Sequence, residues 1–414
     1  MKTLVVADDI TGANDIAVMY AKSGLKTITY TCGSEALFAS GESVCVVDTD
    51  SRFLPAQEAY RRVYQRVAQN PGCHRYFDKQ CSVFRGNIGA EFDAMLDALG
   101  EDFAAVVLGY PANGRTTVNS IHYVHGVRLE DSQFRHDPVH PMVLSDLRQI
   151  LGQQTRRKVG AITVSDLDLG EEALRRRVET LRQQVNYLIF DVRDDRDLAR
   201  IAAVIRDVRV VCGSAGIGYY LGLEECRRRG EPVLAVAGSL TPQTRAQTEY
   251  IREQGYPVLQ LDTAAIARGQ AEQAAAAILS QARALAAGNL LMLHTPQTPE
   301  EVAQTKEIAR ERGLDNVAIS GLISQTLAQI TRELSARLGI RKCIILGGDT
   351  SAAFCREMGI SGMEVLEEIE PGIPLLKKPD APQYFVLKSG SFGTPAFVEA
   401  AYYKLLSRCL LYTS

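Results

Sequence analysis

Short apolar runs alternate with longer amphipathic stretches along almost the whole chain, and this alternation limits the possible folds more than any other feature. The runs are mostly rich in Val and Ile and predict buried strands, whereas the stretches between them predict helices. Strands and helices in alternation are typical of parallel sheets covered by helices. In the first half we expect strands at 4–7, 44–47, 104–108, 161–164, 187–192 and 208–212, and helices at 89–99, 171–185 and 195–206.

The second half repeats this organisation after a break in the pattern. The segment 227–232 (Arg-Arg-Arg-Gly-Glu-Pro) is charged, contains Gly and Pro, and is followed at once by a new apolar run. A chain of 414 residues has room for two or three domains of roughly 150 residues. We therefore expect two α/β domains with mainly parallel sheets flanked by helices, at 1–229 and 230–414. The second should contain strands at 233–237, 290–293 and 342–346, and helices at 271–287, 299–312 and 320–338.

One stretch of the first half, 109–141, departs from the alternation. It contains three prolines and several glycines, with short β-like pieces at 120–123 and 126–129. We expect a hairpin with a loop, inserted into the first domain.

Composition excludes several classes of protein. The 46 basic and 49 acidic residues give a net charge of −3, which argues against a nucleic-acid partner bound through a broadly basic surface. No apolar run reaches the roughly 18 residues of a membrane-spanning helix, and the first residues do not resemble a signal peptide. Nine cysteines without a Cys-x-x-Cys pair indicate reduced thiols, so we expect a cytoplasmic location and no membrane partner. The six histidines are dispersed, and no metal ligands are assigned.

The first candidate site follows the first expected strand, where 7–15 has the sequence Ala-Asp-Asp-Ile-Thr-Gly-Ala-Asn-Asp. Ligands of open α/β sheets bind outside the carboxyl ends of strands. A helix cap would need only one of these polar residues. The stretch therefore favours a functional role for Asp9 over a simple cap.

A second candidate site is an anion site at 79–87, Lys-Gln-Cys-Ser-Val-Phe-Arg-Gly-Asn. A strand ending near Phe77 leads to Lys79, Ser82 and Arg85, and then to the start of a helix. Two cations and a hydroxyl beside free helix amides suit a carboxylate or a phosphate. The alternative is that both cations are simply solvated. Arg52 and Arg115 are candidates to join the site.

The second half contains three turns that are rich in small residues, and each follows an expected strand and precedes an expected helix. They are Gly-Ser-Leu-Thr-Pro at 238–242, Gly-Gly-Asp-Thr-Ser at 347–351 and Lys-Ser-Gly-Ser-Phe-Gly-Thr-Pro at 388–395. Glycines allow a backbone to approach a phosphate, and Asp349 could bind Mg²⁺ or accept a proton. The turns at 347–351 and 388–395, found in one domain, favour a nucleotide site. The turn at 238–242, taken alone, is nearly as compatible with helix capping as with ligand contact. There is no Walker A loop, and 213–218 does not fit the dinucleotide fingerprint, which disfavours an oxidoreductase.

Taken together, these motifs resemble the four-carbon acid sugar kinase family over nearly the whole chain. The amino-terminal motifs are 7–15, Arg-Gly-Asn-Ile-Gly at 85–89 and Pro-Ala-Asn-Gly-Arg at 111–115. The carboxyl-terminal motifs are Gly-Ser at 238–239, 347–351, Glu-Pro-Gly-Ile-Pro at 370–374 and 388–393. The resemblance implies an amino-terminal domain for a sugar acid, a carboxyl-terminal domain for ATP, and a ligand cleft between them.

The resemblance also implies site residues and cofactors. ATP and Mg²⁺ are the expected cofactors, because Mg²⁺ neutralises charge between phosphates. Asp349 is the first candidate for the catalytic base and Asp9 the second. The acid is expected to contact Asp9, Arg52, Lys79, Cys81, Ser82, Val83, Phe84, Arg85 and Arg115, and the nucleotide Ser239, Gly347, Gly348, Asp349, Thr350, Gly390 and Gly393.

The expected reaction is phosphorylation of the terminal (4-) hydroxyl of a four-carbon sugar acid, with D-threonate as the first expectation. Relatives commonly have Asp and Thr where this chain has Cys81 and Val83, which leaves substrate stereochemistry open. The alternatives are erythronate, L-threonate or 4-hydroxythreonine as substrate, or a non-catalytic sensor of sugar acids or nucleotides. A homo-oligomer is left open.

Overall fold

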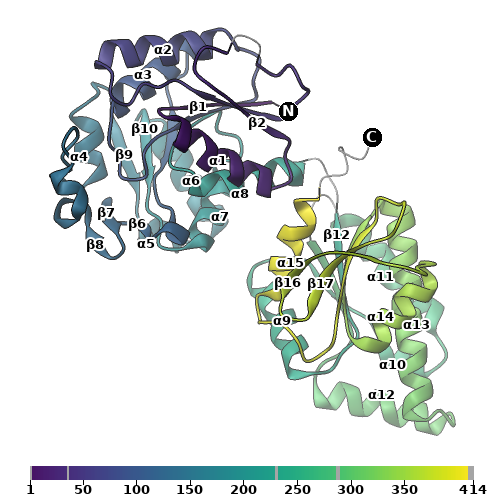
Figure 1. The fold of residues 1–414 in the computed structure, drawn as a ribbon. Coiled ribbons are helices and arrows are strands. Elements are labelled where there is room, and N and C mark those ends of the chain that lie inside the picture. Colours follow the sequence, from purple (N-terminus) through teal and green to yellow (C-terminus); the bar gives the residue numbers. More distant parts are fainter. Residues whose placement is uncertain (1, 35–36, 229–231, 286–289, 409–414) are drawn as a thin grey trace. The chain divides into compact units, whose positions relative to one another are not determined.

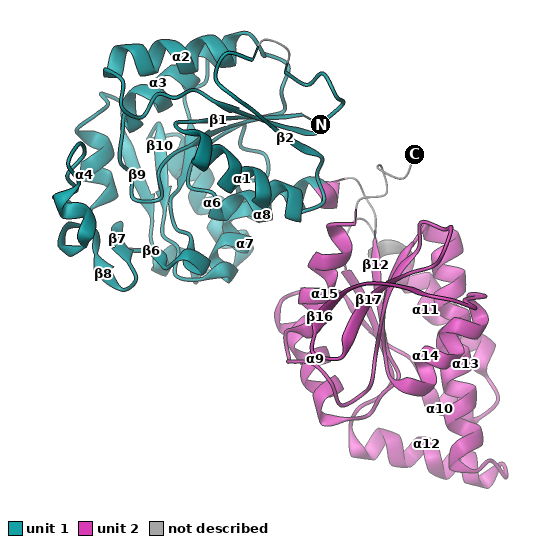
Figure 2. Cartoon of the chain, in the orientation of Figure 1, with its two compact units in different colours: residues 1–225 teal, residues 226–414 magenta. Residues whose placement is uncertain are grey.

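The computed structural model describes residues 2–34, 37–228, 232–285 and 290–408. The chain divides into two compact units, residues 1–225 and 226–414 (Figure 2). The boundary expected between residues 229 and 230 lies outside the described residues. Two α/β units with mainly parallel sheets confirm the predicted fold class.

Unit 1 is built on an eight-stranded sheet in the order β2-β3-β1-β4-β11-β5-β10-β9, with every neighbouring pair parallel. The central strands are buried on both faces, which explains their continuous apolar character. The strands are β1 (Thr3–Ala7), β2 (Thr27–Tyr30), β3 (Val44–Asp48), β4 (Arg75–Lys79), β5 (Ala104–Val107), β9 (Val159–Ile162), β10 (Tyr187–Phe190) and β11 (Val210–Gly213).

Helices cover both faces of this sheet (Figure 1). The helices α2, α3 and α4 pack on one face, over a core that includes Val63, Phe92 and Leu147. The helices α1, α6, α7 and α8 lie on the other face. The helices are α1 (Ile10–Lys22), α2 (Ala56–Ala68), α3 (Ile88–Leu99), α4 (Leu147–Gly152), α5 (Val164–Leu167), α6 (Glu171–Arg182), α7 (Asp195–Val204) and α8 (Gly216–Arg228), whose last residues belong to unit 2.

The predicted inserted hairpin is confirmed as a three-stranded antiparallel sheet of β6 (Arg115–Val118), β7 (Ile121–Val124) and β8 (Val127–Arg128). Short 3₁₀ helices η1 (Pro111–Asn113), η2 (Leu129–Asp131) and η3 (Gln133–His136) flank it. Asp191, just after β10, accepts hydrogen bonds from the backbone amides of Asn119 (2.6 Å) and Ser120 (2.8 Å) in the β6–β7 turn. One buried carboxylate thereby fastens the insert to the main sheet.

Unit 2 has a seven-stranded sheet in the order β13-β14-β12-β15-β18-β17-β16. The first five strands are parallel, and β17 and β16 add an antiparallel edge. The strands are β12 (Val233–Ala237), β13 (Val258–Gln260), β14 (Leu290–His294), β15 (Lys342–Leu346), β16 (Glu364–Glu370), β17 (Ile373–Lys377) and β18 (Tyr384–Lys388).

The helices of unit 2 also lie on both faces of its sheet (Figure 1). Those from α10 to α14 pack on one face and share a core with the strands, whereas α9 and α15 pack together on the other. The helices are α9 (Pro242–Glu253), α10 (Thr263–Ala267), α11 (Ala271–Leu285), α12 (Pro299–Glu311), α13 (Asn316–Leu338), α14 (Gly348–Glu357) and α15 (Phe397–Leu406).

Some element boundaries differ from the sequence-based expectation. The strand expected at 161–164 ends at Ile162, because Thr163 and Asp166 form a capping box that starts α5. The helix expected from 320 begins at Asn316, since the Asp315 side chain accepts a hydrogen bond from the Ala318 amide. Residues 286 and 287 of the helix expected at 271–287 lie outside the described residues. No helix in the described residues is long and apolar enough to cross a membrane.

Candidate active site

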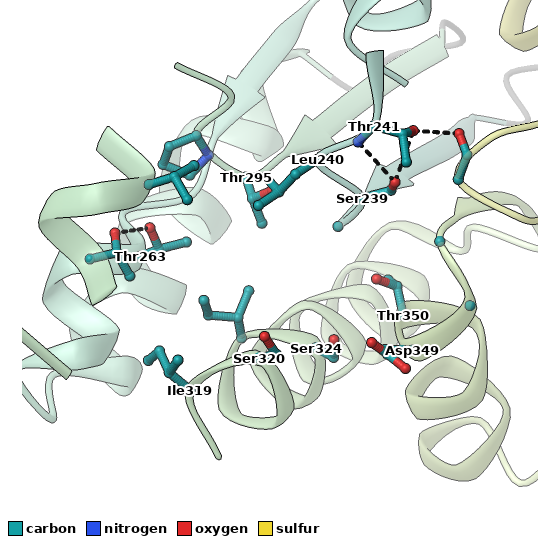
Figure 3. A pocket seen from close by; sticks show the side chains of 18 of the residues that line it. Ser239, Leu240, Thr241, Thr263, Thr295, Ile319, Ser320, Ser324, Asp349 and Thr350 are labelled. Carbon is teal, nitrogen blue, oxygen red and sulfur yellow. Dashed lines mark hydrogen bonds between the residues drawn. The ribbon is translucent and has the colours of Figure 1, made fainter. Parts of the chain in front are cut away.

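A cavity of unit 2 with a volume of about 430 Å³ lies at the carboxyl ends of its parallel strands (Figure 3). Carboxyl ends of parallel strands meet at one edge of a sheet, so the turns after β12, β14, β15 and β18 all reach this cavity. Of the seven residues expected to contact the nucleotide, the cavity is lined by Ser239, Gly347, Gly348, Asp349, Thr350 and Gly390. Gly393 is not among the lining residues.

Three glycine positions let the turns of this cavity lie against one another. Gly347 has a φ of 124°, a backbone conformation that favours glycine. A Cβ on Gly238 would lie 2.1 Å from the Thr350 hydroxyl oxygen, and one on Gly390 would lie 2.2 Å from that of Ser239. Side chains at these positions would force the turns apart.

The glycine end of the cavity is suited to an anion. The ten-residue helix α14 begins at Gly348, so its first backbone amides lack partners within the helix. Asp349 lies in this first turn, is exposed, and lines the cavity (Figure 3). A carboxylate beside an anion site can accept a proton from a reacting hydroxyl or hold a cation that accompanies phosphates.

The opposite end of the cavity is apolar. Ile319 lies there, on the same side as a pair of hydroxyls, those of Thr263 and Thr305, 2.8 Å apart (Figure 3). The apolar side chains of Leu240, Val302 and Ile323 also line the cavity. A cavity with an apolar end and an anion-binding end suits a nucleotide, whose base and phosphates differ in the same way. Sequence reasoning missed the residues of the apolar end. They lie mostly on α10, α12 and α13, where the only signal was an amphipathic pattern shared with any core helix.

The expected acid site of unit 1 begins where β1 ends. Asp9 caps α1 and accepts a hydrogen bond from the Gly12 amide at 2.5 Å. Asp8 is buried and forms a two-point ion pair with Arg52, through Nε at 2.6 Å and Nη2 at 2.8 Å. The remaining Nη1 of Arg52 contacts the Asp9 carboxylate. The predicted proximity of Asp9 and Arg52 is thus present in the structure.

These contacts change the role that Arg52 can perform. Burial by itself would lower the pKa of Arg52, but the hydrogen bonds and charge of Asp8 outweigh it and raise the pKa. Burial raises the pKa of Asp8, against the opposing charges of Arg52 and Lys79. Because its guanidinium is occupied by two carboxylates, Arg52 in this structure holds Asp8 and Asp9 in place. The expectation that Arg52 contacts the acid stays a prediction, and a ligand carboxylate there would compete with Asp8 and Asp9.

Lys79 is the second cation at this edge and lies beside the start of α1. Its Nζ donates to the Gln80 carbonyl oxygen at 3.0 Å and lies 3.9 Å from Oδ2 of Asp15. A Cβ on Gly12 would lie 2.9 Å from this Nζ. Lys79 and Asp9 therefore flank the same glycine.

Arg85 lies under the inserted segment. Its Nη1 contacts Oδ2 of Asp137, its Nε donates to Sγ of Cys81 at 3.4 Å, and its guanidinium lies 5.3 Å from the centroid of the Phe134 ring. The predicted proximity of Arg85 and Cys81 is present. The carboxylate that Arg85 holds in the structure belongs to the protein itself.

Three of the expected acid-binding residues are placed differently. Val83 and Phe84 are fully buried in the hydrophobic core, so their side chains offer no surface to an acid in this structure. Arg115 bonds to the Asn113 carbonyl oxygen and to Nε2 of His125. Arg115 begins β6, within the insert that the sequence predicted.

Ser82 is fastened to the insert by His122, a residue that sequence reasoning missed. Nε2 of His122 lies 3.0 Å from the Ser82 carbonyl oxygen, which can only accept, so this nitrogen carries the proton. Nδ1 then accepts from the Thr117 hydroxyl at 3.0 Å. Burial lowers the pKa of His122 to about 4, so the imidazole is neutral near pH 7 and holds this arrangement.

Acid is expected to destabilise unit 1 through His122. Burial lowers the pKa of His122 from 6.5 to about 4, so between these pH values the unfolded chain binds the extra proton. Stability from this group is therefore complete above pH 6.5 and is lost towards pH 4, by about 3 kcal/mol. Urea unfolding of the wild type and of His122→Gln at pH 7 and pH 4 measures it, and the variant should lose less stability on acidification.

The wild type has to be compared with His122→Gln because Asp78 changes the stability of unit 1 with pH in the opposite direction. Burial raises the pKa of Asp78 to about 8, so the folded chain gains stability from this group as the pH falls below 8. Exposed His136 provides a matched control, and His136→Gln should behave as the wild type. Equal acid sensitivity of the wild type and His122→Gln would contradict the assignment.

Comparisons with known proteins agree with the division into two units. Residues 3–221 match a sugar-binding N-terminal domain and residues 234–398 a nucleotide-binding C-terminal domain. A sugar-binding and a nucleotide-binding domain in one chain, with full-length relatives that are kinases, define a small-molecule kinase. The chain belongs to the four-carbon acid sugar kinase family, as its motifs predicted.

Relatives in this family extend over the full length of the chain. A 3-oxo-tetronate kinase of Burkholderia multivorans is 34% identical, with 96% of this chain and 95% of the relative covered. A 3-oxo-tetronate kinase of Haemophilus influenzae is 30% identical, with 96% and 98% covered. A crystallised protein of Bordetella bronchiseptica, described as a domain-swapped dimer with bound citrate, has a TM-score of 0.80 at 26% identity, with 99% of each chain covered.

Proposed function

We propose that this kinase transfers the γ-phosphate of ATP to the terminal (4-) hydroxyl of a four-carbon sugar acid. The observation that carries the proposal is the cavity of unit 2, which combines an apolar end with glycine turns, a helix amino terminus and the exposed carboxylate of Asp349. Its volume of about 430 Å³ is within the range of small-molecule sites. The nucleobase occupies the end near Ile319, and the phosphates lie against Gly347 and Gly348.

The acid binds at the carboxyl edge of the unit 1 sheet, beside Lys79 and Arg85. The contact between Arg85 and Asp137 supports this placement. It shows that the guanidinium of Arg85, which we propose binds the substrate carboxylate, can hold a carboxylate in this position. A substrate carboxylate would displace Asp137 or bind to the nitrogens that Asp137 leaves open. Asp9 and Ser82 are assigned to the hydroxyls of the acid.

Asp349 is our proposed catalytic base, with Asp9 as the second candidate. Among the described residues, no group of three or more His, Cys, Asp or Glu side chains forms a metal site. We therefore propose a metal ion that binds together with the nucleotide. Asp349 is the carboxylate of the cavity lining that could contact this ion. Mg²⁺ would neutralise charge between the phosphates.

The identity of the acid has two supported candidates. The names of the relatives support 3-oxo-tetronate, whereas the motifs of this chain favour D-threonate. By their names, both acids have a carboxylate at carbon 1 and a hydroxyl at carbon 4, and they differ in oxidation state at carbon 3. Cys81 and Val83 replace an acid and a hydroxyl common in relatives, so we place the selection between acids near this motif.

The test is an ADP-release assay with 3-oxo-tetronate, D-threonate, L-threonate, erythronate and 4-hydroxythreonine, followed by locating the phosphate in the product. We expect acid-dependent ADP release and phosphate at carbon 4. Release of ADP without a phosphorylated acid would contradict the proposal, and so would phosphate at another carbon. Binding of acid and nucleotide without turnover would support the sensor alternative.

Two further expectations stay proposals. A homo-oligomer is supported by the dimer described for the Bordetella bronchiseptica protein. A cytoplasmic location fits the sequence but is untested.

A further inference from the structure

The turn that follows β18 is held from below by a buried lysine. Lys388 is the last residue of β18 and is 2% exposed. Its Nζ donates to the carbonyl oxygen of Phe392 at 2.7 Å and to that of Gly390 at 3.2 Å. Lys388 does not line the cavity, whereas Ser389, Gly390 and Ser391 do. The lysine therefore contacts the far side of a turn whose other side forms the cavity wall.

The same two carbonyl groups also accept hydrogen bonds from α9. The Gly390 oxygen accepts from the hydroxyls of Thr241 at 2.5 Å and Thr244 at 3.1 Å. The Phe392 oxygen accepts from Nε2 of Gln247 at 3.1 Å. These three donors are spaced by three residues and share one face of the helix. Two carbonyl groups thus receive five hydrogen bonds, which fixes the orientation of both peptide planes.

The orientation of these carbonyl groups determines where two amides point. In a trans peptide the C=O and the following N–H point in opposite directions, and the described chain has no cis peptide bond. The N–H groups of Ser391 and Gly393 therefore point away from Lys388 and α9. Within the described residues, neither amide donates a hydrogen bond. A backbone amide that has no hydrogen-bond partner and points away from the buried Lys388 is available to bind a phosphate.

We propose that Lys388 is a positioning residue that fixes the amide of Ser391, which lines the cavity, for the phosphates of the bound nucleotide. The inference rests on the proposed function, in which this cavity binds ATP. It assigns Lys388 no direct contact with the ligand. Thr244 and Gln247 perform the same task from α9.

The energetics of the site support this role. Burial lowers the pKa of Lys388 to about 8, with the charge of Glu370 opposing the shift. Burying an amine is unfavourable unless its hydrogen bonds compensate, and a methionine of similar length would fill the same space without that cost. A lysine at this position is thus better explained by the carbonyl groups it holds than by packing alone.

Titration calorimetry of the full chain with ATP, ADP and adenosine tests the inference. Lys388→Met should raise the Kd for ATP and ADP by roughly 10- to 100-fold, because the unfixed turn no longer presents the Ser391 amide to the phosphates. The Kd for adenosine should change less than about 2-fold, since the apolar end is untouched. The KM for the acid should also stay within about 2-fold, because the acid binds in unit 1.

A milder series keeps the test decisive if Lys388→Met fails to fold. Thr244→Val removes one hydroxyl donor at constant shape and should weaken ATP binding by roughly 3- to 10-fold, whereas Thr244→Ser retains the hydroxyl and should restore it. Thr331→Val is the matched control. Its buried hydroxyl bonds to the Leu327 carbonyl oxygen within α13, away from the turn. This control should bind ATP as the wild type does.

The outcomes separate the inference from the proposed function. Equal losses for ATP and adenosine would overturn the inference, because a positioning role acts only on the phosphates. Unchanged ATP binding in both Lys388→Met and Thr244→Val would overturn it as well. A wild-type chain that binds none of the three ligands would overturn the proposed function, and the inference with it.

Discussion

Replacing Asp349 with asparagine is expected to lower kcat by roughly 10²- to 10⁴-fold while the Kd for ATP stays within a few-fold. The side chain lies in the first turn of α14, exposed to the cavity and beside the glycine turns assigned to the phosphates. Asparagine retains the size and the hydrogen-bonding carbonyl of the side chain but cannot take a proton from the attacking hydroxyl. The measurement is kcat by ADP release, with the Kd for ATP from calorimetry.

The controls for Asp349→Asn separate a base from a metal ligand. Glu311→Gln removes an exposed carboxylate at the end of α12 and should leave kcat unchanged. Recovery of the Asp349→Asn rate at high Mg²⁺ would identify a metal ligand and contradict the role as base. A rate close to that of the wild type would transfer the assignment to Asp9.

Replacing Arg85 with alanine should raise the KM for the acid by roughly 10²-fold, because a charge-assisted contact to a carboxylate is lost. The Kd for ATP should stay unchanged, since the nucleotide cavity belongs to unit 2. Steady-state kinetics with the acid varied at saturating ATP measure the effect. Arg85→Ala also affects Asp137, because alanine leaves the carboxylate of Asp137 without its ion-pair partner.

Asp137→Asn is therefore the companion variant. It keeps Arg85 and removes the competing charge, so the KM for the acid should not rise. Arg61→Ala, which removes an exposed ion pair with Glu58, is the surface control and should match the wild type. If Arg85→Ala abolished ATP binding and left the affinity for the acid intact, the division of labour between the units would be reversed.

The parts of the fold that could be predicted from the sequence are those where burial leaves a clear pattern. Strands such as β10 and β15 are apolar and buried on both faces, so their runs stand out. For the strand β4 the sequence predicted only an end near Phe77, whereas the strand ends at Lys79. It carries the buried cations Arg75 and Lys79, whose nearest carboxylates, those of Glu225 and Asp15, are distant in the sequence. Charge that is neutralised by distant residues has no local signature.

The antiparallel edge of unit 2 illustrates the same limit. The strand β16 has four glutamates and several exposed residues, and it pairs with β17 only at the sheet edge. Its alternation is weak because neither face is fully buried. Strand direction in this edge depends on a turn at Gly372, whose φ is 76°.

The sequence by itself determined that the chain has two α/β units, which turns lie at strand ends, and which family these turns belong to. Local spacing is enough for that, because a turn motif brings its own backbone geometry. Only the tertiary structure decided how the cations are used. It showed that Arg52 is already paired with Asp8 and Asp9, that Arg85 holds Asp137, and that Lys388 lies beneath a glycine turn. A charged side chain takes its role from its partners, and those partners are 44, 43 and 52 residues away for the two arginines.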